Sequence, residues 1–412
     1  MNMNFFDELQ AASLGFGQAS AAIDEWLQRL RSRAIERDRV GGSLADDLRE
    51  LAALGVTAAR LPVELGGLGF SYPQAVDLLV ALARADSSAA QSLRSHFLAV
   101  EQLVNAPAAA RDAFLTAEIA AGRIIGAATT EIGSVEVGSV QTRLATDADG
   151  QLRLDGAKFY TTGAGYAHWV QVFAADAQGR HVIATVARDA PGVVVVDDWD
   201  GVGQRLTMSG SMRFENVRVD PARVRLRSPA DAAPSARQDA MAQITHLATL
   251  TGIAIRAFED SVAWLDGRTR HFSHAAAATP AQDPVVQQIV GRLSAVAGTA
   301  LLALRSAARE LQAAASAPAG AGDPFRDAHR SVTQLQVVLP SLILDAAQSL
   351  FDVGGGSMVV ASRGFDRHWR NARTIASHNP SPQKARVLGH EALNGVALPD
   401  VWFVGTPKES AL

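Results

Sequence analysis

The chain has 412 residues, of which 48% are apolar and 19% are charged, and its formal net charge is −4. This composition is typical of a globular protein, and the charge gives no indication of a nucleic-acid partner or an acidic membrane surface. The sequence contains no cysteine, which excludes disulfides, thiolate metal sites and cysteine nucleophiles. A small molecule is therefore the expected ligand.

The first residues lack the basic segment and long apolar run of a signal peptide. Elsewhere, polar residues or glycines interrupt the apolar stretches before the ~20 residues that a membrane span needs. We therefore expect a cytoplasmic protein.

Residues 1–122 carry apolar side chains at helical spacing, for example Leu44, Leu48 and Leu51. Gly41–Gly42 separates two of the expected helices, and a longer turn surrounds Leu61–Pro62. We predict an N-terminal helical domain.

Between residues 123 and 232, β-forming residues are separated by turn sequences. Val182–Val186 is an expected strand, and Asp147–Gly150 is an expected hairpin turn. This pattern predicts a compact middle domain that forms an antiparallel β-barrel.

Helical spacing returns over residues 233–395, and residues 396–412 are expected to form a tail. The Ala/Pro/Gly-rich stretch Ala313–Gly322 is an expected connection between antiparallel helices, followed by a helix from about Asp327 to Leu350. We predict a four-helix bundle here, so the fold class is α+β.

A nicotinamide-binding Rossmann domain is not indicated. The order of elements has no βαβ alternation, and Gly201–Gln204 lacks both a third glycine and a following helix.

Several segments nevertheless resemble the acyl-CoA dehydrogenase superfamily: Leu61–Gly69, Thr130–Ser134, Gly156–Gly163 and Arg270–Phe272. Two further segments are similar to its reduced-flavin-dependent monooxygenase branch, the type of dibenzothiophene monooxygenase and the sulfur-acquisition oxidoreductases. These are Trp199–Ser211, and Asp366–Thr374 followed by Ser377–Pro380. Each motif is weak alone, but their order and spacing together are specific.

The resemblance implies a change of chemistry at one position. Family members that desaturate acyl thioesters place a proton-abstracting Glu where this chain has Asn379, directly after His378. An amide cannot act as a general base. Glu259, on a helix of the expected bundle, remains an alternative base for dehydrogenation.

For oxygen chemistry, the resemblance implies that His378, His96 and Thr162 are catalytic, acting through a C4a-hydroperoxyflavin. It also implies a substrate pocket that contains Val100, where the dibenzothiophene enzyme has Tyr. The implied pocket residues are His96, Val100, His246 and Asn379. The implied flavin contacts are Thr130, Ser134, Thr161, Thr162, Trp199, Arg270, Phe272, Gly354, Gly355, Arg370 and Arg373. No metal site is expected, because no cluster has ligand spacing.

Each assignment also has a structural alternative. His378 is compatible with a turn cap and His96 with a core histidine. Trp199 is compatible with barrel core, Arg370 and Arg373 with surface ion pairs, and Gly354–Gly356 with a helix terminator.

The flavin is expected to be reduced FMN. FAD-dependent relatives place a Gln just before the glycine pair, whereas Val353 precedes Gly354 here; the retained Arg270 and Phe272 leave FAD open. The missing nicotinamide fold implies a separate flavin reductase, with O₂ and a small molecule as the other reactants. The resemblance further implies a homotetramer that completes each flavin site across subunits.

Three functions thus follow. The first is the oxygenase component of a two-component monooxygenase for a small organosulfur or other heteroatom-containing compound. The second is an acyl-CoA dehydrogenase, and the third is a flavin-binding protein without turnover.

Overall fold

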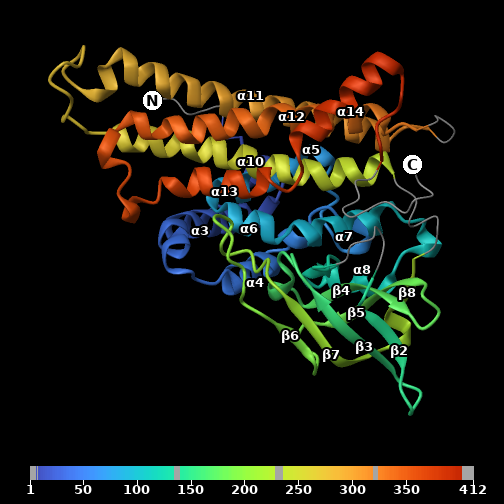
Figure 1. Cartoon of the computed structure of the whole chain (residues 1–412). Coiled ribbons are helices and arrows are strands. Elements are labelled where there is room, and N and C mark those ends of the chain that lie inside the picture. Colours follow the sequence, from blue (N-terminus) through green and yellow to red (C-terminus); the bar gives the residue numbers. More distant parts are fainter. Residues whose placement is uncertain (1–5, 7, 134–139, 228–234, 319–322, 401–412) are drawn as a thin grey trace.

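The computed structural model describes residues 6, 8–133, 140–227, 235–318 and 323–400. Helices of the C-terminal region lie at the top of Figure 1, the N-terminal helices lie in the middle, and the sheet lies at the bottom. This order places the short helices α6 and α7 between the bundle and the sheet. Ser134, an expected flavin contact, lies outside the described residues.

The N-terminal region of the described chain consists mainly of helices. They are α2 (Ala11–Leu14), α3 (Ser20–Val40), α4 (Ala45–Ala53), α5 (Tyr72–Ala85), α6 (Ser87–Ser92), α7 (Arg94–Asn105) and α8 (Ala113–Ala120). Most residues of α5 are buried, so it is a core helix of the molecule. It begins with a capping box in which the side chains of Ser71 and Gln74 each accept a hydrogen bond from the other residue's backbone N–H.

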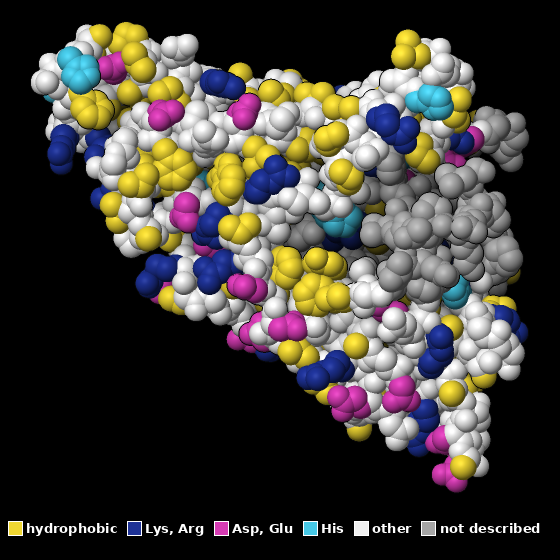
Figure 2. All heavy atoms as spheres, in the orientation of Figure 1, with side chains coloured by type: hydrophobic (Ala, Val, Ile, Leu, Met, Phe, Trp, Pro, Cys, Tyr) yellow, Lys and Arg dark blue, Asp and Glu magenta, His cyan; other side chains and the backbone are white. Residues whose placement is uncertain are grey.

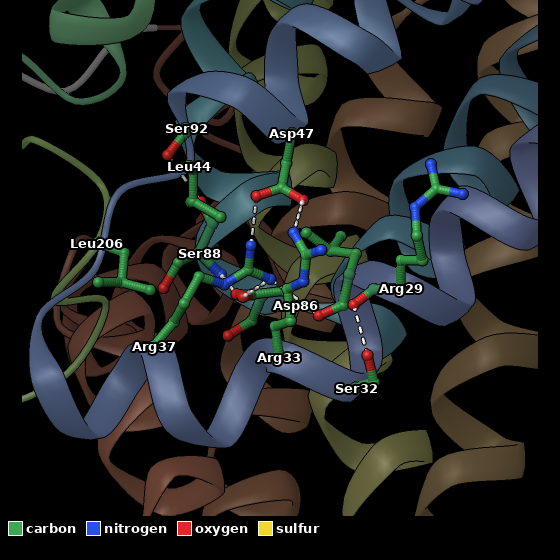
Figure 3. Close-up of polar contacts among 12 residues, drawn as sticks. Arg29, Ser32, Arg33, Arg37, Leu44, Asp47, Asp86, Ser88, Ser92 and Leu206 are labelled. Carbon is green, nitrogen blue, oxygen red and sulfur yellow. Dashed lines mark hydrogen bonds and ion pairs between the residues drawn. The ribbon is translucent and has the colours of Figure 1, made fainter.

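A buried ion-pair cluster fixes α3 against α4 and α6 (Figure 3). The Arg37 guanidinium donates to Asp47 at 2.5 Å and to Asp86 at 3.3 Å. Asp86 in turn accepts a hydrogen bond from the Ser88 N–H at 2.9 Å and so caps α6. The cluster therefore positions the start of the α6–α7 segment.

The middle region is one sheet of eight strands. They are β1 (Ile125–Ala128), β2 (Arg143–Thr146), β3 (Leu152–Lys158), β4 (Trp169–Asp176), β5 (His181–Ala187), β6 (Val193–Val195), β7 (Met212–Val219) and β8 (Val224–Leu226). The hydrogen-bonded order is β6-β7-β3-β2-β4-β5-β8, with β1 beside β4. In β7, Met212, Phe214, Val217 and Val219 are buried while the residues between them are exposed, so one face of the sheet carries the core.

The fold class is confirmed, but the expectation of a purely antiparallel barrel is wrong. Both β1 and β2 pair with β4 in parallel, in the registers Ile125↔Trp169 and Arg143↔Ala175. Within the described residues, the two end strands β6 and β8 do not pair with each other. The sheet is therefore mixed and open.

The C-terminal helices surround α10. They are α10 (Ala236–Leu265), α11 (Pro284–Ala315), α12 (Arg326–Ser349), α13 (Asp366–Ala376) and α14 (Ser381–Asn394). α10 packs against α5, α11, α12 and α13 and so joins the bundle to the N-terminal helices. The expected helix from about Asp327 to Leu350 corresponds to α12.

α11 is the one helix of the described chain that is long and apolar enough to cross a membrane, judged by length and composition. Of its most apolar stretch, 28% is buried in this chain. α11 packs against α10, α12 and α5. Figure 2 shows hydrophobic side chains among charged ones along the upper helices.

Candidate active site

Thr161–Gly163 follows β3 and forms a strip of hydroxyl groups between the sheet and the helices. The Thr161 hydroxyl donates to the Gly210 carbonyl at 3.0 Å, and the hydroxyls of Thr162 and Ser209 share a hydrogen bond of 2.8 Å. At Gly163, where φ is +77°, an added Cβ would lie 1.8 Å from the Ser92 carbonyl oxygen. Only glycine therefore allows this close contact between the strip and the end of α6.

The loop that begins at Thr130 is anchored by a buried ion pair. The Glu131 carboxylate accepts hydrogen bonds from Lys158 Nζ at 2.5 Å and from the backbone N–H groups of Gln141 and Thr142 at 2.7 and 3.0 Å. Burial alone would raise the pKa of Glu131, but Lys158 and these N–H groups lower it to about 2. Thr130 is exposed on this anchored loop, and its carbonyl accepts a hydrogen bond from Phe159.

Two predicted histidines meet where α10 faces the end of α13. The ring centroids of His246 and His378 are 4.2 Å apart. His246 is buried and neither ring nitrogen has a partner in the described structure, whereas His378 is open to solvent on one side. Burial and then the Arg94 charge hold the pKa of His246 well below its ordinary value and lower that of His378 to about 4. Both rings are therefore neutral near pH 7.

Asn379 belongs to a polar network that includes Gln243 and Asp239 of α10. Its side-chain amide donates to Gln243 Oε1 at 2.5 Å, and the Gln243 amide donates to Asp239 Oδ1 at 2.9 Å. His329 and Lys384 contact Asp239 Oδ2 at 2.9 and 3.3 Å. Asn379, which the resemblance places where desaturating relatives have a Glu, is thus fixed by α10 and offers no carboxylate.

The structure places His96, a predicted catalytic pocket residue, inside the core between α7 and β1. His96 is completely buried; its Nε2–H donates to the Thr57 carbonyl at 2.8 Å, and Nδ1 accepts from the Ile125 N–H at 3.1 Å. Both nitrogens are occupied, so the ring ties α7 to β1. Val100, one turn later, is also completely buried and belongs to a core cluster with Leu103. His96 and Val100 therefore both have the surroundings of core residues.

Trp199 lies beside the hydroxyl strip. Its Nε1–H donates to the Gln204 carbonyl at 3.0 Å, the same oxygen that accepts a hydrogen bond from the Thr207 hydroxyl. The Thr207 hydroxyl also shares a hydrogen bond of 2.7 Å with Ser209. Because Trp199 is half-buried and its ring contacts Tyr160 edge-on at 6.1 Å, its indole is partly open for a planar ligand.

The predicted arginine contacts are engaged differently. The Arg370 guanidinium donates to Asp38 at 2.5 Å and to Asp366 at 2.7 Å, so the ion-pair alternative describes it. Arg373 donates to the Ser377 hydroxyl at 3.2 and 3.1 Å and is half-exposed.

Four predicted flavin contacts lie away from the His246–His378 pair: Arg270, Phe272, Gly354 and Gly355. Gly354 packs against Trp264 near the end of α10, Gly355 faces Phe272, and Arg270 is exposed. At 1.5 Å per helical residue, Trp264 lies about 27 Å from His246 along α10. One chain therefore does not bring Arg270, Phe272, Gly354 and Gly355 to the His246–His378 site.

The alternative base, Glu259, is not a free carboxylate. It is buried, accepts a hydrogen bond from Arg84 Nε at 2.6 Å and lies 3.4 Å from Arg31. Two arginines thus hold it in the interface of α3, α5 and α10. The described residues contain no group of three or more His, Asp or Glu side chains arranged to hold a metal ion.

Comparison with known proteins agrees with this architecture. Residues 19–123, 126–217 and 244–381 match the N-terminal, middle and C-terminal domains of acyl-CoA dehydrogenase. The chain is 30% identical to the probable FMNH₂-dependent monooxygenase SfnC of Pseudomonas putida, over 91% of this chain and 95% of that protein.

The chain belongs to the acyl-CoA dehydrogenase family.

Two other members of the family are similar along nearly their whole length. Dibenzothiophene monooxygenase of Rhodococcus erythropolis is 28% identical, over 89% of this chain and 91% of that protein. The crystal structure of TdsC from Paenibacillus sp. A11-2 with FMN and indole has a TM-score of 0.84 and 26% identity, and covers 93% of this chain and 99% of that chain.

The residues present fit an FMN ring. The half-buried Thr162 hydroxyl, supported by Ser209, offers a hydrogen bond to its polar edge, Trp199 offers an aromatic face, and His246 offers two unpaired buried nitrogens. Sequence reasoning missed Arg94, at the start of α7. Its only signal in the sequence is its position two residues before His96. That signal is misleading, because the sequence pattern does not predict the break between α6 and α7 at Leu93.

Proposed function

We propose that this chain is the oxygenase component of a two-component, reduced-FMN-dependent monooxygenase that acts on a small organosulfur compound. The family relatives SfnC and dibenzothiophene monooxygenase carry this type of activity in their names. One observation supports oxygenation over desaturation: Asn379, which the resemblance places where desaturating relatives have a catalytic Glu, is an amide that donates a hydrogen bond to Gln243.

The chain's own residues supply positioning and proton handling. Thr130, Thr162, Ser209 and Trp199 would hold the FMN ring, and reduced FMN supplies the activated oxygen when it is bound. His378 is neutral near pH 7, so its ring can accept or donate a proton at a nitrogen next to the ring site. The buried position of His246 keeps bulk water away from its side of the site.

A separate reductase and a homotetramer complete the proposal. The order of elements in the described residues contains no nicotinamide-binding unit, which supports a separate protein as the source of reduced FMN. The exposed apolar side chains Val285 and Leu302 on α11 and Val338 on α12, which are 64%, 56% and 49% exposed, support contact between copies of this chain. Such contact would bring the Arg270 and Gly354–Gly355 region of one copy to the flavin of another.

Replacement of His378 tests the proposal. We expect His378→Ala to fold normally and to lose at least about tenfold in oxygenated product formed per reduced FMN consumed, with more H₂O₂ released, because a positioned acid–base group contributes ~10²–10⁴-fold. Product and H₂O₂ are measured together with sulfinate, thioether, sulfoxide and sulfone substrates. The exposed His390→Ala on α14 is the control. Unchanged product yield in His378→Ala would show that this site assignment is wrong.

A further inference from the structure

Arg94 is a largely buried cation without a partner. Its Nε is buried and makes no hydrogen bond, and no ion pair involves its guanidinium within the described part of the chain. Burial lowers its pKa to about 10, so the side chain remains charged at pH 7. A buried charge of this kind costs free energy unless a ligand or water satisfies it.

The nearby acid does not neutralise Arg94. The Asp239 carboxylate accepts hydrogen bonds from Gln243, His329 and Lys384, and the Lys384 ammonium balances its charge. The two groups whose pKa values Arg94 lowers, His246 and His378, are neutral. The cluster of Arg94, His246 and His378 therefore carries a net positive charge.

Arg94 also lies next to the segment that is expected to hold the flavin. It is flanked by Ser92, whose carbonyl contacts Gly163, and by Ser95, whose hydroxyl donates to the Thr162 carbonyl at 3.5 Å. The solvent-open side of His378 gives a ligand access to the cluster. An anion bound here would lie beside the oxygen-donating centre.

We propose that Arg94, His246 and His378 bind the S–O oxygens of an organic sulfinate, so that the substrate is an anion rather than a neutral sulfur compound. This inference rests on the proposed function. The positive charge of the cluster favours an anion over a neutral molecule. A guanidinium can also donate two parallel hydrogen bonds to two oxygens that are bonded to one atom, as in a sulfinate. Among sulfur oxyanions, a sulfinate still has a lone pair on sulfur for oxygenation, whereas a sulfonate has none.

Binding of two small probes tests the inference. Methanesulfinate and dimethyl sulfone share a methyl group and two S–O oxygens but differ in charge. Their affinities for the FMN-loaded full chain are measured by calorimetry in the wild type, Arg94→Gln, Arg94→Lys and Arg49→Gln, an exposed control with the same change in net charge. We expect Arg94→Gln to weaken methanesulfinate binding roughly ten- to hundredfold, with a smaller effect on the sulfone, and Arg94→Lys to recover part of the loss.

A purely structural role for Arg94 predicts a different outcome. Since no described residue forms a hydrogen bond or ion pair with its side chain, Arg94→Gln should not lower the melting temperature. Equal loss of both probes, a loss of FMN affinity in place of sulfinate affinity, or unchanged sulfinate binding would overturn the inference. If the wild type oxygenates thioethers with reduced FMN but does not bind methanesulfinate, this inference fails and the proposed function stands. If sulfinate binds but no reduced-FMN-dependent oxygenation occurs, the proposed function fails.

Discussion

Two histidines that the sequence assigned to the same active site, His378 and His96, have different surroundings in the structure. His378 has an open side and faces His246, whereas His96 is enclosed with both nitrogens bonded to backbone groups. The sequence pattern predicted His378 and Asn379 because both lie in a specific run after α13. It could not place His96, because the break at Leu93 between α6 and α7 changes which residues of α7 face the site. Arg94 is the first residue of α7 after this break.

His96 gives a prediction about pH. Burial lowers its pKa to about 4, below the ~6.5 of an unfolded histidine. The unfolded chain therefore binds more protons in this window, so stability is present above about pH 6.5 and is lost as pH falls toward 4.

We expect His96→Leu to lose about 2–4 kcal/mol of stability at pH 7.5, because the Ile125 N–H and the Thr57 carbonyl lose their partner. We also expect it to lose about 2 kcal/mol less than the wild type between pH 7 and pH 5. Urea unfolding at each pH measures both effects. An unchanged pH dependence would contradict this account of His96.

At the scale of elements, α10 joins the parts of the site. It carries Asp239, Gln243 and His246 on one face, and these residues fix Asn379 and meet His378. Periodicity predicted the order of helices, strands and helices, because side-chain spacing is a local property. It did not predict the parallel pairing of β1 and β2 with β4, because strand partners are chosen by contacts between residues distant in sequence.

α11 gives a prediction about assembly. If its exposed apolar face contacts another copy, Leu302→Glu should place a charge in that contact and convert the tetramer into smaller species. Size-exclusion chromatography with light scattering measures the mass. Leu393→Glu on α14, where the leucine is 85% exposed, is the matched control and should leave the mass unchanged. A wild-type monomer, or a tetramer that tolerates Leu302→Glu, would contradict the proposed interface.

At the scale of the whole molecule, the expected flavin contacts fall into two groups at distant ends of the bundle. His378 pairs with His246 on α10, whereas Gly354 packs against Trp264, about 27 Å further along the same helix, and Gly355 faces Phe272. Sequence motifs predict which residues contact a flavin, but they do not show whether one chain or two chains supply the contacts to the same flavin. This is why the motifs predicted the family well and the geometry of a single chain poorly.

The account depends on the transfer of one oxygen atom from O₂ to a sulfur compound by a site that lacks a catalytic carboxylate. The most direct test supplies photoreduced FMN and ¹⁸O₂ to the purified protein with methanesulfinate or a thioether, and analyses the product by mass spectrometry. We predict that the product contains one ¹⁸O atom. Product without the label, together with anaerobic bleaching of FMN by an acyl-CoA, would contradict the account and indicate desaturation.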